Sequence, residues 1–194
     1  EVPDENLGTG IWTASDVSGN GDRIVAVTLE GKLVMSSDRG ASFAPVAPRT
    51  GVTLANVESV TLSQDGSRVA VAGFDGLLEV GTVAADGTVT WLAATGLPAG
   101  DWRSIDSSND GLLMVAVAQD PVAFVSRDGG ETWTDLAVSV GSPAAPVLDQ
   151  NWYRVKVSGD GNTIVMAANQ FGGSSGNGIY VSKGRGQTLL PAHQ

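Results

Sequence analysis

The chain has 194 residues and a formal net charge of −10, because 21 acidic residues outnumber 11 basic ones. This balance argues against nucleic acid and anionic membrane surfaces as partners, since both require a basic face. The sequence has no cysteine and a single histidine, His193, which argues against thiolate chemistry, histidine-based triads and metal sites. We therefore expect no metal and no cofactor.

A four-residue turn signature recurs along the chain and reveals internal repeats. It has serine first, Asn or Asp third and glycine fourth. Its copies begin at Ser18, Ser63, Ser108 and Ser158, at intervals of 45, 45 and 50 residues. Each copy is followed by an apolar run: Ile24–Val27, Val69–Ala72, Leu113–Ala116 and Ile164–Ala167. Repeats of this length indicate a supersecondary unit that buries its faces against its neighbours.

The first repeat predicts four short strands, at Trp12–Val17, Arg23–Thr28, Lys32–Ser36 and Ser42–Val46. Four antiparallel strands in a period of about 40–50 residues are typical of a β-propeller blade. A β-sandwich does not repeat its turn chemistry so regularly, and a β-helix has shorter coils. We therefore predict one all-β domain, 1–194, with blades at about 11–47, 55–93, 101–138 and 151–192.

A second motif joins the third and fourth strands of a repeat. It reads Ser126-Arg127-Asp128-Gly129-Gly130-Glu131-Thr132-Trp133, and Ser36–Phe43 matches it. The Asp side chain can accept backbone N–H groups, the glycine supplies a positive φ, and the aromatic is predicted to be buried. This motif resembles the Asp-box (BNR) repeat of sialidase-like and photosystem II assembly-factor-like β-propellers. That resemblance implies structural roles for Ser36, Asp38, Gly40, Phe43, Ser126, Asp128, Gly130 and Trp133.

The motif is incomplete in the other two repeats. In the second, Ala84–Thr88 is typical of an ordinary Asp-Gly hairpin. In the fourth, Gly184 and Leu189 replace the Asp and the aromatic, so the last hairpin is predicted to be weaker. Two loops also interrupt the repeat, Gly141–Pro146 and Phe171–Asn177, and they are either functional insertions or products of drift.

Aligning the repeats on the four serines places equivalent residues of the inner strands in columns. One column holds Trp12, Val57, Trp102 and Trp152, which we expect to pack between blades. The next holds Thr13, Glu58, Arg103 and Tyr153, and the one after it Ala14, Ser59, Ser104 and Arg154. We predict that the candidate ligand-binding residues near the channel mouth are Glu58, Arg103, Tyr153 and Arg154.

The sialidase resemblance implies an arginine cluster for a carboxylate, a Tyr nucleophile paired with a Glu, and an acidic proton donor. The chain has these residue types in Arg103, Arg154, Tyr153, Glu58, Asp16 and Asp106. A third well-placed arginine is missing, and sialidases have six blades rather than four. The same polar groups can equally solvate the strand ends, and Asp38 and Asp128 are expected to bond within turns rather than ligate metal.

Two functions remain as hypotheses. The first is a non-catalytic binding or scaffold module of an exported protein, extracellular or periplasmic, with a protein or glycan ligand. The alternative is a glycoside hydrolase or carbohydrate-binding protein of sialidase-like type that uses the channel mouth. Four blades can close as a monomer, form half of an eight-bladed ring in a homodimer, or belong to a longer chain.

Overall fold

The computed structural model describes residues 7–119, 122–136, 151–168 and 178–191, which form four four-stranded antiparallel sheets. Blade 1 consists of β1 (Trp12–Val17), β2 (Ile24–Thr28), β3 (Leu33–Ser36) and β4 (Ala44–Pro45). Blade 2 consists of β5 (Val57–Leu62), β6 (Arg68–Gly73), β7 (Leu78–Val83) and β8 (Val89–Trp91). Blade 3 consists of β9 (Trp102–Ser107), β10 (Met114–Ala118), β11 (Ala123–Ser126) and β12 (Thr134–Asp135). Blade 4 consists of β13 (Trp152–Val157), β14 (Thr163–Ala168), β15 (Gly178–Lys183) and β16 (Thr188–Pro191).

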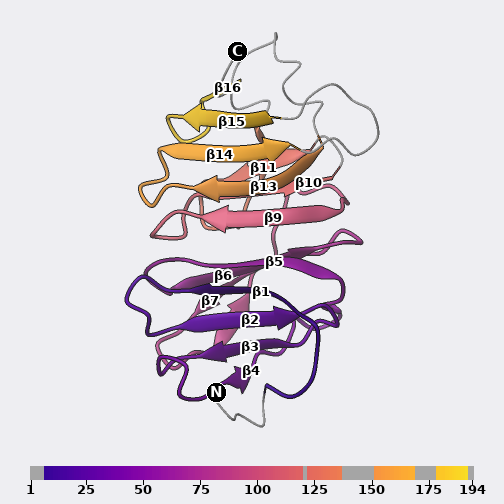
Figure 1. Cartoon of the computed structure of the whole chain (residues 1–194), viewed down its shortest axis with the longest axis vertical. Coiled ribbons are helices and arrows are strands. Elements are labelled where there is room, and N and C mark those ends of the chain that lie inside the picture. The colour runs from indigo at the N-terminus through magenta and orange to yellow at the C-terminus, as the bar shows by residue number, and fades with distance from the viewer. Residues whose placement is uncertain (1–6, 120–121, 137–150, 169–177, 192–194) are drawn as a thin grey trace.

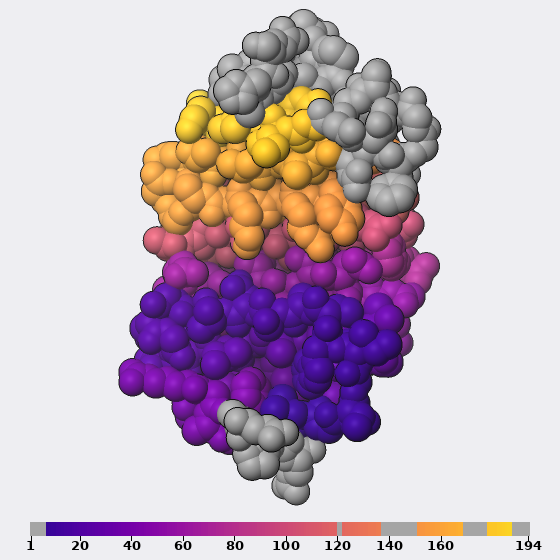
Figure 2. Space-filling view, viewed as in Figure 1, coloured from indigo at the N-terminus to yellow at the C-terminus, as the bar shows by residue number. Residues whose placement is uncertain are grey.

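The predicted all-β propeller architecture is confirmed. In every sheet the strand order follows the chain, and the first strands pack side by side in the order β1, β5, β9 and β13. Blades 1 and 4 extend in opposite directions from these inner strands, so that β4 and β16 lie at opposite ends of the described structure (Figure 1). Among the described strands, β1 and β13 do not form a packed pair. The blades therefore form an open arc, with blade 1 at one end and blade 4 at the other (Figure 2).

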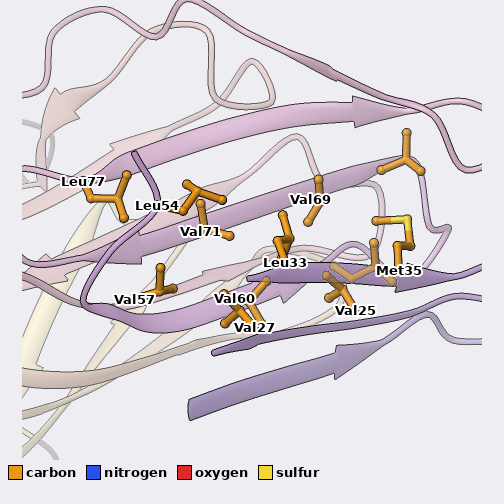
Figure 3. Close-up of a cluster of buried hydrophobic side chains, with 12 residues drawn as sticks. Val25, Val27, Leu33, Met35, Leu54, Val57, Val60, Val69, Val71 and Leu77 are labelled. Atoms are coloured by element: carbon orange, nitrogen blue, oxygen red, sulfur yellow. The ribbon is translucent and has the colours of Figure 1, made fainter. Parts of the chain in front are cut away.

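Three apolar clusters hold the arc together, one at each contact between successive blades. Between blades 1 and 2, Val25 and Val27 of β2 meet Val69 and Val71 of β6, and all four are fully buried (Figure 3). Because side chains alternate across a strand, the intervening residues of β6, such as Ala70, face blade 3 instead. The middle strands are apolar on both faces for this reason, as expected of strands sandwiched between neighbours.

The predicted packing role of the tryptophan column is confirmed for two of its members. Trp102 packs in the cluster between blades 2 and 3, and Trp152 packs in the cluster between blades 3 and 4. Trp152 also contacts Tyr180 edge to face, with 5.1 Å between ring centroids. Trp12, at the start of the arc, is 39% exposed.

The recurring serine signature forms the same turn in all four blades. Each serine hydroxyl accepts the backbone N–H five residues later, as in Ser63 to Arg68 at 2.9 Å and Ser158 to Thr163 at 2.9 Å. The Asp or Asn two residues after the serine accepts the serine hydroxyl. Glycine at the fourth position has a positive φ, which a left-handed turn favours. Identical bonds explain why the signature repeats.

The second motif also builds a turn through its Asp side chain. Asp128 accepts the Ser126 hydroxyl at 2.8 Å, the Thr132 N–H at 2.9 Å and the Thr132 hydroxyl. Trp133 is 3% exposed beside this hairpin, and its indole N–H donates to the Gly130 carbonyl at 3.1 Å. In the turn of blade 1, Asp38 accepts the same three bonds from Ser36 and Ser42, whereas Phe43 has no indole N–H and is only partly buried, contrary to the prediction.

Strand boundaries in blade 1 agree with the sequence prediction to within one residue, except at the outer strand. Asp38 binds both the N–H and the hydroxyl of Ser42, at 2.9 and 2.6 Å, so Ser42 belongs to the turn. The predicted strand Ser42–Val46 therefore shortens to Ala44–Pro45. His193 and the loops Gly141–Pro146 and Phe171–Asn177 lie outside the described residues. Within the described part of the chain, no helix has the length and apolar character needed to span a membrane.

Replacing Asp128 with alanine is expected to lower the free energy of unfolding by about 1–3 kcal/mol, because the turn loses its shared acceptor. Glu131→Ala is the matched control, since it removes a carboxylate from the same turn and leaves the backbone N–H that Asp128 accepts. Urea unfolding of both variants checks this prediction. Equal stabilities would show that the Asp side chain is not what holds the hairpin.

Turn carboxylates also predict an acid-sensitive fold. Hydrogen bonds from Ser42 and Ser36 lower the pKa of Asp38 from 3.8 to about 2, and bonds from Ser158 and Asn162 do the same for Asp160. A carboxylate with a depressed folded pKa stabilises the fold above its unfolded pKa, and this contribution is lost as pH falls through about 2. The double variant Asp38→Asn, Asp160→Asn should therefore show a shallower fall of the urea midpoint between about pH 5 and pH 2. An unchanged slope contradicts the assignment.

Candidate functional site

A β-bulge at the start of each inner strand determines where the polar column points. The registers skip one residue between Trp12 and Ala14, and equivalent shifts occur in the other three blades. The unpaired residues are Thr13, Glu58, Arg103 and Tyr153. A bulge redirects a side chain and increases the local twist. The polar column of the sequence is thus the set of bulged residues, which simple strand alternation does not predict.

Glu58 and Arg103 lie together between blades 2 and 3. The closest guanidinium and carboxylate atoms are 3.8 Å apart, and both side chains are mostly buried. The Arg103 guanidinium also donates to the Gln119 side-chain oxygen and lies over the Phe74 ring, 4.4 Å from its centroid. Arg103 is therefore held on several sides by its own chain.

Arg154 and Tyr153 continue this group onto blade 4. The Arg154 guanidinium stacks on the Tyr153 ring, 4.7 Å from the centroid, and its Nη1 donates to the Arg103 carbonyl at 3.0 Å. Tyr153 is 41% exposed and Arg154 is also exposed. The structure thus brings all four predicted residues into one continuous group, the bulge cluster, with Tyr153 and Arg154 on its outer side.

A second group lies toward the opposite end of the inner strands, and it includes Asp16 and Asp106, the acidic residues that the sialidase resemblance implied. It contains one residue from each blade, Asp16, Thr61, Asp106 and Lys156, and it lines a pocket of about 210 Å³. We call it the carboxylate column. Each member stands two residues before the repeat serine, so a wider alignment of the inner strands identifies the column from sequence.

The carboxylates of this column join neighbouring blades. Asp16 accepts the Leu62 N–H at 2.7 Å, and Asp106 accepts the Val157 N–H at 2.6 Å. Asp106 also accepts Lys156 Nζ at 3.0 Å. Side-chain acceptors thus satisfy backbone donors that no strand pairing reaches.

Burial is the main cause of an unusual titration at Asp106. Desolvation raises the pKa of its carboxyl above 3.8, the nearby Asp16 charge raises it further, and the Val157 and Lys156 bonds oppose the rise. Loss of solvation disfavours the charged form of a carboxyl. A raised carboxyl pKa can serve proton transfer, although here the same oxygens are bonded to blade 4.

Comparisons with known proteins identify the fold. No family model and no curated protein matches the chain. Among solved structures, the Niastella koreensis GH74 enzyme is 17% identical, with a TM-score of 0.67, over 93% of this chain and 30% of that one. Kuenenia stuttgartiensis hydrazine synthase is 17% identical, with a TM-score of 0.65, over 91% and 48%. The RRP9 WD40 repeats are 13% identical, with a TM-score of 0.69, over 94% and 51%.

These similarities show that the chain has a propeller-type fold. The chain spans about half the length of two of these structures and less than a third of the GH74 enzyme. They include both an enzyme and WD40 repeats, so the fold is shared by proteins of different function.

Replacing Asp106 with alanine is expected to lower the free energy of unfolding by about 1–3 kcal/mol, because the partly buried Val157 N–H loses its acceptor. Asp106→Asn keeps an acceptor oxygen and isolates the effect of charge. Because the folded pKa of Asp106 is raised, its stabilising contribution is present below the unfolded pKa and falls as pH rises through the folded pKa. Asp106→Asn should thus cost less stability near pH 7 than near pH 4 in urea unfolding. A cost that grows with pH contradicts this assignment.

Proposed function

We propose that this chain is a non-catalytic binding or scaffold propeller of Asp-box type, belonging to an exported protein, and that it binds its ligand at the bulge cluster. The observation that carries the proposal is that the four residues of the cluster differ in pairing and in exposure to solvent. Glu58 and Arg103 neutralise each other and are mostly buried, whereas Tyr153 and Arg154 present an aromatic ring and a cation to solvent. An exposed, mutually stacked Tyr and Arg is typical of binding hot spots.

The bonds of the acidic residues favour binding over catalysis. The Glu58 carboxylate faces Arg103, and Arg154 stacks on one face of the Tyr153 ring, so these contacts do not form a nucleophile and base pair. The Asp106 carboxylate holds β13 through the Val157 N–H. Glu58 and Asp106, two of the groups that glycoside hydrolysis would use, are thus engaged in contacts between blades.

The chemistry of the outer pair indicates the class of ligand. Arg154 retains the geometry to donate to a carboxylate, and the Tyr153 ring offers an apolar face with few rotatable bonds. A protein segment with acidic and aromatic or proline side chains fits this pair. The Asp-box resemblance and the WD40 repeats among the structural neighbours support a protein-binding role.

Glycan binding or hydrolysis is the second candidate. The exposed Tyr153 ring can stack on a sugar ring, and one structural neighbour is a GH74 enzyme. Under this alternative Glu58 and Tyr153 act on the ligand itself.

An array of acidic and neutral peptides, probed with the purified chain, tests the proposal. We expect acidic peptides to bind and the affinity to fall at least about tenfold in Tyr153→Ala and Arg154→Ala, because each removes an exposed anchor. Leu112→Ala is the matched control, since Leu112 is a 42% exposed side chain in the serine turn of blade 3.

Two results would overturn the proposal. One is peptide binding that is absent or unaffected by either substitution. The other is turnover of fluorogenic sialosides or glucosides that Tyr153→Phe or Glu58→Gln abolishes, which would establish the alternative.

A further inference from the structure

The first end of the arc exposes side chains that are buried in the inner blades. Trp12 is 39% exposed, whereas the equivalent Trp102 and Trp152 are 0% and 1% exposed. Val17 on the same strand is 45% exposed. Trp102 and Trp152 each pack against the preceding blade. The face of blade 1 that carries Trp12 therefore has the side chains that pack against a preceding blade elsewhere in the arc.

The last end of the arc exposes the complementary set. Val165 of β14 is 37% exposed, although the residues at the same register in the other blades, Val25, Ala70 and Val115, are fully buried. Ile179 of β15 is 55% exposed. Residues at these positions pack against the following blade elsewhere in the arc.

The two ends therefore carry the two halves of one repeated interface. Between blades 2 and 3, Trp102 and Met114 of blade 3 pack with Ala70 and Val80 of blade 2. The equivalent residues at the free ends are Trp12 and Ile24 on blade 1, and Val165 and Val181 on blade 4. The free face of blade 1 and the free face of blade 4 thus carry the two sets of apolar side chains that pack together between successive blades.

Charge continues the same pattern. Successive members of the carboxylate column contact one another, with Asp16 and Thr61 3.2 Å apart, Thr61 and Asp106 3.5 Å apart, and Asp106 and Lys156 3.0 Å apart. The next step around the column would place Lys156 of one chain beside Asp16 of another. These opposite charges favour a contact between blade 4 of one copy and blade 1 of the other over a contact between two like blades.

Backbone bonds between the serine turns follow the same direction. Gly19 donates to Gln64, Asp65 donates to Asn109, and Asn109 donates to Gly159. If a blade like blade 1 followed blade 4, the serine turn of blade 4 would donate one more backbone bond of this kind to it. The direction of donation again places the blade 1 face next to the blade 4 face.

We propose that a second copy of this chain covers both free faces, so that two arcs close into one eight-bladed ring. Blades 1 and 4 extend in opposite directions from the inner strands and turn their free faces to the same side of the molecule (Figures 1 and 2). A half-turn about the channel then sets blade 4 of each copy against blade 1 of the other.

Light-scattering mass of the 194-residue chain tests the proposal. We expect a sharp mass of about twice 19.8 kDa at micromolar concentrations. A mass of 19.8 kDa overturns it and leaves further blades in the same polypeptide as the occupants of the faces. A series of larger masses overturns it as well, because head-to-tail contacts that do not close make open filaments.

Two charged substitutions, each in one face, locate the interface. Trp12→Glu and Ile179→Glu should each raise the dimer dissociation constant at least about a hundredfold, because each buries an unpaired charge in both symmetric contacts. Leu112→Glu is the control, since Leu112 is 42% exposed away from both faces and should leave the dimer intact. Far-UV circular dichroism checks that each variant is folded.

Mixing the two variants distinguishes head-to-tail closure from other dimers. In the proposed ring, each variant alone is monomeric, and the mixture forms a heterodimer through its one unmodified contact. If only one of the two substitutions dissociates the dimer and the other leaves it intact, the dimer joins like faces and the proposal is overturned.

Discussion

Packing of one blade on the next is the constraint on which this structure depends. A four-stranded sheet with apolar side chains on both faces is not stable by itself, and each inner blade buries one face against its predecessor and the other against its successor. Fully burying a valine contributes roughly 1.5–3 kcal/mol. Clusters of such residues at every blade contact therefore outweigh any single turn or ion pair.

The inner strands combine this structural role with the candidate site. Their side chains supply acceptors such as Asp16 and Asp106 to backbone N–H groups of the following blade, which ties the arc together near the channel. Where each strand begins, a bulge releases one residue from this pattern. Bulges therefore allow Glu58, Arg103 and Tyr153 to meet without disturbing the apolar faces.

The fold of this chain is shared by proteins of different function. The propeller provides a rigid arc on which a few bulged residues are placed, and propellers with quite different activities use the same arc. In the bulge cluster of this chain, a partly buried ion pair lies beside an exposed Tyr and Arg. Repeat proteins also require covered end faces, so the exposure of Trp12 and Ile179 links assembly to the same architecture.

The division of the chain into blades could be predicted from the sequence alone. The hydrogen bonds of the Ser63 and Asp128 turns join residues close in the chain, so they require serine, aspartate and glycine at regular intervals. Continuous apolar runs such as Ile24–Val27 indicated which strands are buried, and an alignment of repeats placed Glu58, Arg103, Tyr153 and Arg154 in neighbouring columns. Only the tertiary structure decided that these four meet, because a bulge depends on the pairing of two strands and has no residue type of its own. It alone also decided that the arc is open, since closure depends on the angle between packed sheets, a property of many side chains acting together.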